Sequence, residues 1–384
     1  MGGVTLTAGL AGSLALASTA HAQPGGTFAY VAQTQSDTVA VIDTSTNTVV
    51  GTIAVGDGPQ DVAVSPDGTR AYVVGFNDDS LSVIDTSTDT VIGTVTVGDG
   101  PRAVAVSPDG TRVYTANQLS DGVSVIDTSS NTVTGTVAVG DNPQDVAVSP
   151  DGTRAYTANQ LSDGVSVINT STNTVVDTVA VGSVPQGVAV SPDGSRVYSA
   201  NQNSDDVSVI DTSSNTVVDT ISVGDAPQKV ALSPDGTRAY VSNIGDDTVS
   251  VIDTAGNTVV DTIAFPAGSE PFGVTVNPSG SRLYVSAVTA GTVSAVSTLT
   301  NSVVATVAVG GEPSGLDVAA VPAASDAACP AGSVLTGGGF ELTGPPPSGL
   351  TSKPEGDAWE VSLLNETAEN ISLTPYAVCA DNTP

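Results

Sequence analysis

The chain has 384 residues with 40 acidic and 9 basic side chains, which gives a formal net charge of −31. A polyanionic surface without a basic patch repels phosphate backbones, so we expect no nucleic-acid partner. The single histidine, His21, lies in the apolar N-terminal segment, so a chain without that segment has no His for a nucleophilic triad or for a zinc, copper or haem site.

Residues 1–22 are apolar and rich in small side chains, and they end in Ala20-His21-Ala22. An A-x-A ending after an apolar run, here Leu10 to Leu16, is typical of a secretory signal peptide. No Lys or Arg precedes the run, which a start codon assigned too far downstream would explain. We therefore expect cleavage after Ala22 and a secreted protein, released or held at the cell surface, without an integral membrane segment in the mature chain.

One stretch recurs from residue 28 to 321, and its second copy reads GPQDVAVSPDGTRAYVVGFNDDSLSVIDTSTDTVIGTVTVG at 58–98. A tyrosine marks each copy: Tyr30, Tyr72, Tyr114, Tyr156, Tyr198, Tyr240 and Tyr284. The first six tyrosines are 42 residues apart and the last gap is 44 residues. A period of this size indicates a repeat architecture.

Each copy contains four short runs rich in Val, Ile, Tyr and Thr, which in the second copy are 61–65, 70–74, 80–85 and 90–97. These runs predict four antiparallel strands, the number in a propeller blade. Pro66-Asp67-Gly68 joins the first two runs, and this combination indicates a hairpin turn in which Asp is structural rather than catalytic.

The first copy begins at Phe28 and lacks its own first strand, whereas residues 315–321 supply a strand that no further copy follows. We therefore predict an all-β fold in which residues 23–321 form a seven-bladed β-propeller of four-stranded antiparallel blades. The C-terminal strand would pair with the first three strands and close the ring, which removes open sheet edges.

The copies read VYTAN, AYTAN, VYSAN and AYVSN after SPDG[TS]R, and then continue as VSVIDTSTNTVV. This pattern resembles the YVTN-type β-propeller repeat of secreted and cell-surface proteins, over residues 28–321. The resemblance implies a scaffold fold found in surface-layer and adhesion-like proteins. It does not fix a function, because one propeller fold hosts many activities.

Functional residues are expected where the copies differ, around the mouth of the propeller channel. The residue after the loop proline varies as Gln60, Arg102, Gln144, Gln186, Gln228, Phe272 and Ser314. A second ring, three residues after each tyrosine, is Gln33, Gly75, Asn117, Asn159, Asn201, Asn243 and Ala287. Together they predict an amide-rich mouth that hydrogen-bonds a neutral polar ligand such as a sugar or peptide. The alternative is that these amides only satisfy backbone groups.

Two further sets of repeated charged residues have mainly structural interpretations. The acidic loops 77–79, 203–206 and 245–247 offer oxygen ligands for Ca²⁺, but their spacing matches no known Ca²⁺ loop, and Asx-type turns are the favoured alternative. No other cofactor is expected. The repeated arginines are expected to pair with carboxylates of neighbouring blades: Arg70, Arg112, Arg154, Arg196, Arg238 and Arg282.

A second unit, residues 329–384, follows a small-residue linker at 322–328. Its Cys329 and Cys379 bracket a small secreted module, which predicts one disulfide. SVLTGGGFEL, AWEVSLLNE and ISLTPYAVCA predict strands. The unit resembles small C-terminal β modules of secreted actinobacterial proteins, and Trp359 is expected in its core rather than against a sugar.

These features predict a secreted, non-enzymatic propeller that serves as an extracellular or cell-surface binding scaffold, with an envelope component, glycan or protein as partner. The alternative is an extracellular hydrolase or lyase with a His-free site at the propeller mouth that uses Asp, Tyr or Arg102. Two neighbouring carboxylates with raised pKa values in the mouth would favour this alternative.

Overall fold

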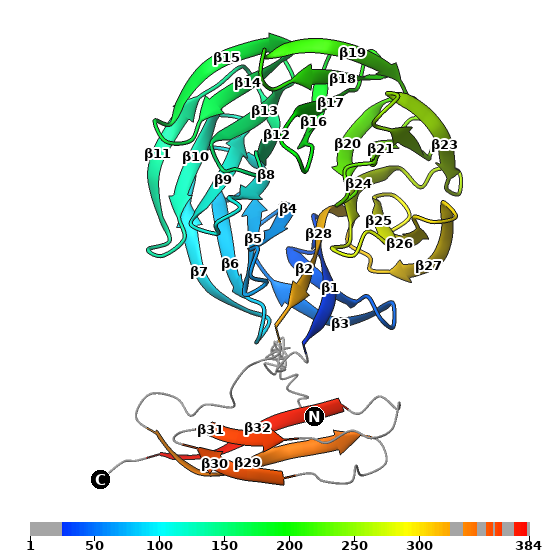
Figure 1. Ribbon diagram of the computed structural model, residues 1–384. Coiled ribbons are helices and arrows are strands. Elements are labelled where there is room, and N and C mark those ends of the chain that lie inside the picture. The colour runs from blue at the N-terminus through cyan, green and yellow to red at the C-terminus, as the bar shows by residue number, and fades with distance from the viewer. Residues whose placement is uncertain (1–24, 323–332, 344–350, 356–357, 363–371, 382–384) are drawn as a thin grey trace, which may run out of the picture.

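The computed structural model describes residues 25–322, 333–343, 351–355, 358–362 and 372–381. Residues 25–322 form a closed ring of seven four-stranded antiparallel sheets, which confirms the predicted all-β propeller (Figure 1). The predicted signal peptide and Cys329 lie outside the described residues, so cleavage and the disulfide stay predictions.

The blades are named A to G in chain order. Blade A contains β28 (Pro313–Val321), β1 (Gly26–Gln33), β2 (Thr38–Asp43) and β3 (Thr48–Ala54); blade B contains β4 (Pro59–Val64), β5 (Arg70–Gly75), β6 (Ser80–Asp85) and β7 (Thr90–Thr96). Blade C contains β8 (Pro101–Val106), β9 (Arg112–Asn117), β10 (Gly122–Asp127) and β11 (Thr132–Ala138); blade D contains β12 (Pro143–Val148), β13 (Arg154–Asn159), β14 (Gly164–Asn169) and β15 (Thr174–Ala180).

Blade E contains β16 (Pro185–Val190), β17 (Arg196–Asn201), β18 (Asp206–Asp211) and β19 (Thr216–Ser222); blade F contains β20 (Pro227–Leu232), β21 (Arg238–Asn243), β22 (Thr248–Asp253) and β23 (Thr258–Ala264). Blade G contains β24 (Pro271–Val276), β25 (Arg282–Ala287), β26 (Thr292–Ser297) and β27 (Ser302–Ala308). After the propeller, β29 (Ser333–Thr343) pairs with β32 (Ser372–Asp381), and β30 (Thr351–Glu355) pairs with β31 (Ala358–Ser362).

The ring closes where the sequence predicts it. β28 pairs antiparallel with β1, with Gly26 opposite Val321 and Ala29 opposite Val318. Blade A therefore combines the two ends of the repeat region, which lie side by side in Figure 1. Because every blade has two neighbours, both faces of each sheet are covered.

The hydrophobic core is divided among the seven interfaces between blades. Each interface holds one cluster of buried Val, Ile, Leu and Ala side chains together with one repeat tyrosine. The seven tyrosines are at most 2 % exposed. The residue that marks the repeat in sequence is thus the large side chain that packs between each blade and the next.

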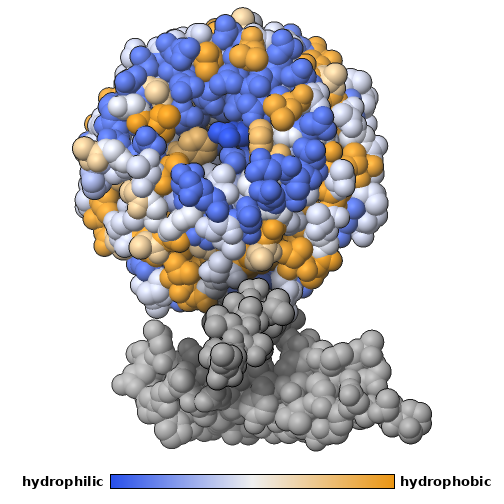
Figure 2. Space-filling view, turned by 180° about the vertical axis from the view of Figure 1, so that it is seen from behind, coloured by the Kyte–Doolittle hydropathy of each residue, from blue (hydrophilic) through white to orange (hydrophobic). Residues whose placement is uncertain are grey.

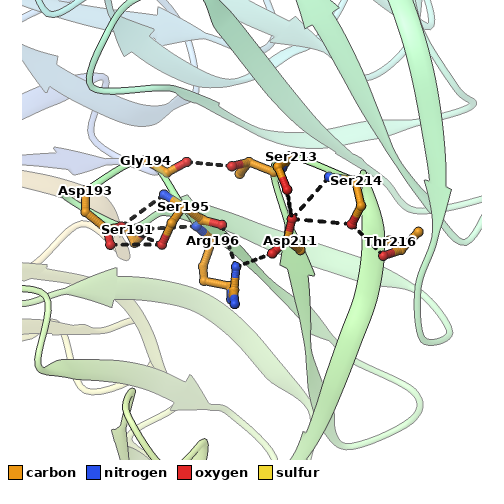
Figure 3. A network of polar contacts seen from close by, with 10 residues as sticks. Ser191, Asp193, Gly194, Ser195, Arg196, Asp211, Ser213, Ser214 and Thr216 are labelled. Carbon is orange, nitrogen blue, oxygen red and sulfur yellow. Dashed lines mark hydrogen bonds and ion pairs between the residues drawn. The ribbon is translucent and has the colours of Figure 1, made fainter.

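The repeated aspartates are turn residues, as predicted. In blade E, Asp193 Oδ1 accepts hydrogen bonds from Ser191 Oγ at 2.6 Å and from the Ser195 backbone N–H at 3.0 Å (Figure 3). Asp211 caps the next turn in the same way, and the hydrogen bond from the Ser213 hydroxyl is the main reason that its pKa falls to about 2. These carboxylates stabilise hairpins and are not arranged for catalysis.

The arginines differ from the prediction. Arg112 Nη1 donates to the carbonyl of Thr170 in the next blade, and Arg154 Nη1 donates to Asn215 Oδ1, also in the next blade. Arg196 forms its salt bridge within its own blade, with Asp211. Because these guanidinium groups lie beside the turns, backbone carbonyls and turn side chains compete with carboxylates of neighbouring blades as acceptors.

Acidic loops between the second and third strands bind the connection to the following blade. Asp37, Asp79 and Asp163 accept backbone N–H groups from Gly58, Gly100 and Val184 respectively, at 2.8–3.0 Å. These three carboxylates therefore have a structural role, but their hydrogen bonds reach 21 residues along the chain and are not the local bonds of an Asx-type turn.

Val184 is a strained member of this series. Its φ is +59°, in the left-handed region that β-branched residues rarely adopt, and the equivalent residues in blades B, C and D are Gly58, Gly100 and Asn142. The hydrogen bond from the Val184 N–H to Asp163 Oδ1, at 2.8 Å, holds Val184 in this conformation.

We expect Val184→Asn to raise the free energy of unfolding by about 1 kcal/mol, because Asn tolerates this backbone conformation better than Val does. Urea-induced unfolding monitored by circular dichroism measures the change. The reciprocal variant, Asn142→Val, should lose at least this amount, because it also removes the hydrogen bonds that Asn142 Oδ1 accepts from Gln118 and Gln144. Unchanged stability in both variants would show that φ at this position carries no strain.

Candidate functional site

The seven innermost strands surround the channel and are irregular at their starts. In blade B, Pro59 pairs with Gly75 and Asp61 with Val74, so β4 has one extra residue, a β-bulge. A bulge turns successive side chains to the same side of a strand. In blade F the corresponding Gln228 and Lys229 both line the central cavity.

The first predicted ring comes together. One face of the propeller is hollowed at its centre, with hydrophilic residues over much of the rim (Figure 2). The central cavity is lined by Gln60, Arg102, Gln144, Gln186, Gln228, Lys229 and Phe272, six of which were predicted. Ser314 is instead buried, and its hydroxyl contacts the carbonyls of Pro59 and Ala32.

The ring leaves almost no free volume. The cavity measures about 10 Å³, which is room for about one water molecule, whereas pockets for small ligands measure roughly 300–1,000 Å³. Arg102 Nη1 donates to Gln60 Oε1 at 2.7 Å, and its guanidinium carbon lies 5.8 Å from the centre of the Phe272 ring. These predicted ligand-binding groups therefore fill the channel mouth by contacting one another.

The second predicted ring does not line the mouth. Its four asparagines are fully buried inside the blades, and the Nδ2 group of each donates to a serine of the neighbouring strand: Asn117 to Ser124, Asn159 to Ser166, Asn201 to Ser208, and Asn243 to Ser250, at 2.9–3.0 Å. Each serine hydroxyl also accepts a backbone N–H of the loop that enters its own blade from the preceding one, as Ser124 does from Gly98. The four asparagine amides therefore bond serine hydroxyls inside the blades, whereas the expected alternative was that they satisfy backbone groups.

Sequence reasoning missed a charged cluster one residue further along the inner strands. Lys229 Nζ lies 2.8 Å from Asp145 Oδ1, and these side chains are 16 % and 11 % exposed. Burial alone would lower the pKa of Lys229, but the carboxylates of Asp145 and Asp61 raise it, so the ammonium stays charged. The signal was visible in the sequence, because this position reads Asp61, Ala103, Asp145, Gly187, Lys229, Gly273 and Gly315.

The channel carboxylates also connect the blades. Asp61 Oδ2 accepts the N–H of Val104 at 3.2 Å, Asp145 Oδ2 that of Val188 at 2.9 Å, and Asp317 Oδ2 that of Val64 at 2.9 Å. In each case the donor belongs to the innermost strand of the next blade. That strand pairs with a neighbour on one edge only, and its other edge, which faces the channel, has no pairing strand. The carboxylates thus satisfy edge N–H groups that would otherwise be unpaired.

The electrostatics do not produce a catalytic carboxylate pair. Burial raises the pKa of Asp61 to about 6 and raises that of Asp317. The carboxylate that acts on Asp61 is Asp145, which is ion-paired with Lys229, and no other carboxylate contributes to the shift of Asp317. Among the described residues, the two carboxyl groups with raised pKa values, Asp61 and Asp317, therefore do not act on each other.

The described residues also limit metal and membrane interpretations. Within the described ranges, no three His, Cys, Asp or Glu side chains are grouped as metal ligands would be. The same ranges contain no helix with the length and apolar character of a membrane span.

Asp61 should make stability depend on pH. Its pKa is raised from 3.8 to about 6 by folding, so between these values the folded protein holds a proton that the unfolded chain has released. The ionised carboxylate therefore lowers stability above pH 6, and this cost fades as the pH falls toward 4. We expect Asp61→Asn to be more favourable by about 2 kcal/mol at pH 7.5 than at pH 4.5, measured by urea unfolding. Equal effects at both pH values would contradict a raised pKa.

The ion pair should be revealed by removing one partner. Asp145→Asn leaves the Lys229 ammonium poorly compensated, and we expect it to lose about 3 kcal/mol of unfolding free energy. Adding Lys229→Gln should recover part of that loss. Asp317→Asn is the matched control, because Asp317 accepts a similar backbone N–H without a salt bridge to a described residue. Strictly additive effects of the Asp145 and Lys229 substitutions would exclude coupling.

Comparison with known proteins supports the propeller fold. Hydrazine synthase of Kuenenia stuttgartiensis is similar in structure, with a TM-score of 0.61 and 25 % identity over 67 % of this chain and 88 % of that chain. A functionally unknown protein from Desulfotomaculum acetoxidans has a TM-score of 0.68 and 18 % identity, covering 77 % of this chain and 99 % of its own. No curated protein matches the sequence.

The family match is more specific. The model of the YNCE-like β-propeller family matches residues 69–323, which is more than half of the chain. The family description is YNCE-like rather than YVTN-type, so this match supports the propeller repeats and not the YVTN-type label. The chain belongs to the YNCE-like β-propeller family.

Proposed function

We propose that this protein is a secreted, non-enzymatic propeller that binds a component of the cell envelope through its blade surfaces. The observation that carries the proposal is the filled channel mouth. The residues at its mouth leave about 10 Å³ and are held by hydrogen bonds and ion pairs within the protein. Binding at the exposed faces and loops requires no opening of this network.

Charge and composition support the same proposal. With a net charge of −31, the protein favours neutral or cationic partners over nucleic acids and other polyanions. The apolar leader at 1–22 supports export, and its removal leaves a chain without histidine. Repeated blades present similar surfaces many times, which suits a scaffold better than a single catalytic centre.

A hydrolase or lyase at the channel mouth is the second candidate. The raised pKa of Asp61 favours it, because such a carboxyl group can act as an acid or base near neutral pH. The structural likeness to a hydrazine synthase shows that a similar fold occurs in an enzyme. The closed mouth and the pairing of Asp145 with Lys229 favour the binding role instead.

Co-sedimentation of the chain lacking residues 1–22 with envelopes of the producing organism tests this proposal. We expect saturable binding, measured with and without Ca²⁺. The channel variant Arg102→Gln/Phe272→Leu should bind like the wild type, because the channel is not the contact surface. Absence of binding under all conditions would contradict the envelope role, and binding lost only in the channel variant would transfer the site to the mouth.

A further inference from the structure

Grooves between blades open on the face opposite the channel mouth, where the SPDG turns lie. Three of them, between blades B and C, C and D, and D and E, measure about 290, 740 and 390 Å³. The C/D groove is therefore within the size range of small-ligand sites, unlike the channel.

The three grooves lie next to one another. Pro108 and Asp109 line both the B/C and C/D grooves, and Pro150 and Asp151 line both the C/D and D/E grooves. Neighbouring grooves thus share walls, and equivalent turns recur once per blade. A surface with this periodicity suits a linear ligand made of repeating units.

The walls of the C/D groove combine donors and acceptors with small apolar surfaces. Asp109 uses Oδ1 for its own turn, through hydrogen bonds from Ser107 and Thr111, and its Oδ2 accepts none from the described residues. Arg112 bridges to the carbonyl of Thr170 through Nη1, which leaves other guanidinium N–H groups beside the groove. Pro108 and Pro150 supply apolar rings.

The C/D groove, the largest of the three, also contains a departure from the repeat. Asn169 lines it and stands where most blades have the Asp of VIDT. Asn169 Oδ1 performs the usual turn function, accepting the N–H of Ser171 at 3.0 Å and its hydroxyl at 2.7 Å. Its Nδ2 group makes no hydrogen bond with a described residue. The substitution removes one negative charge and adds a donor that Asp cannot supply.

We propose that the C/D groove, with the B/C and D/E grooves as flanking subsites, binds a neutral polysaccharide of the cell envelope. Paired carboxylate, amide and guanidinium groups match the neighbouring hydroxyls of sugars, and the proline rings match their C–H surfaces. Asp109 and Asp151 disfavour anionic polymers, whereas Arg112 and the neutral Asn169 reduce the attraction for cationic ones. This inference rests on the proposed function and names its ligand.

The C/D groove is tested in the whole chain lacking residues 1–22, with two variants and two matched controls. Asn169→Asp restores the residue of other blades, and Ser171→Trp fills the groove from an exposed turn position. The controls are at the equivalent turn of blade A, outside the three grooves. Asp43→Asn is the reverse of Asn169→Asp, and Ser45→Trp is the same substitution as Ser171→Trp. Circular dichroism of each variant, compared with the wild type, checks that the four variants fold.

The readouts are envelope co-sedimentation and competition by the neutral and anionic polysaccharide fractions released from the same envelopes. We expect the neutral fraction to compete, and its trisaccharide-sized hydrolysate to compete about 100-fold less well, because a polymer occupies several grooves at once. Asn169→Asp should weaken binding about fivefold, as expected for one lost hydrogen bond, and Ser171→Trp more strongly. Both blade A variants should bind like the wild type.

The outcomes separate this inference from the proposed function. Wild-type binding that none of the variants changes would overturn the groove assignment and leave the envelope role intact. Competition by the anionic fraction alone, or binding abolished by protease treatment of the envelopes, would overturn the ligand class. Absence of wild-type binding would overturn both proposals.

Discussion

Each blade can bury its two faces only against its two neighbours, so the structure depends on closure of the ring. Pairing of β28 with β1 provides that closure, and the tyrosine clusters fill each interface. Closure also brings seven unpaired strand edges to one narrow channel. Asp61, Asp145 and Asp317 satisfy backbone groups of these edges, and Lys229 compensates part of their charge. The contacts of these side chains therefore give the channel a structural role in the ring.

The large excess of acidic residues has a mainly structural origin and does not by itself indicate a binding site. Turn aspartates such as Asp193 bind their own hairpins, and loop aspartates such as Asp163 bind the connection to the next blade. The same few aspartate contacts recur in each blade, so the number of acidic residues increases with the number of repeats. The negative field is a consequence of this use, and it restricts partners to those that tolerate it.

The fold could be predicted from sequence because turn chemistry and strand patterning agree in every copy. The sequence also predicted the closing strand, which the structure places at residues 313–321, and the ring of residues that includes Gln60. Both follow from the number and spacing of the repeats. The burial of the four asparagines could not be predicted, because strand alternation does not distinguish side chains that line the channel from side chains that are buried between blades. Lys229 was missed because a β-bulge, which alternation does not reveal, turns it toward the channel together with Gln228. The grooves depend on the spacing of blades, which sequence does not contain.

Hydrogen–deuterium exchange of the chain lacking residues 1–22, with and without saturating envelope fragments, tests most directly whether this propeller works from its surface. We expect protection at the SPDG turns of blades C and D, around residues 107–112 and 149–154, with unchanged exchange at the starts of the innermost strands. Protection confined to the channel mouth, around residues 59–61 and 101–103, would contradict it.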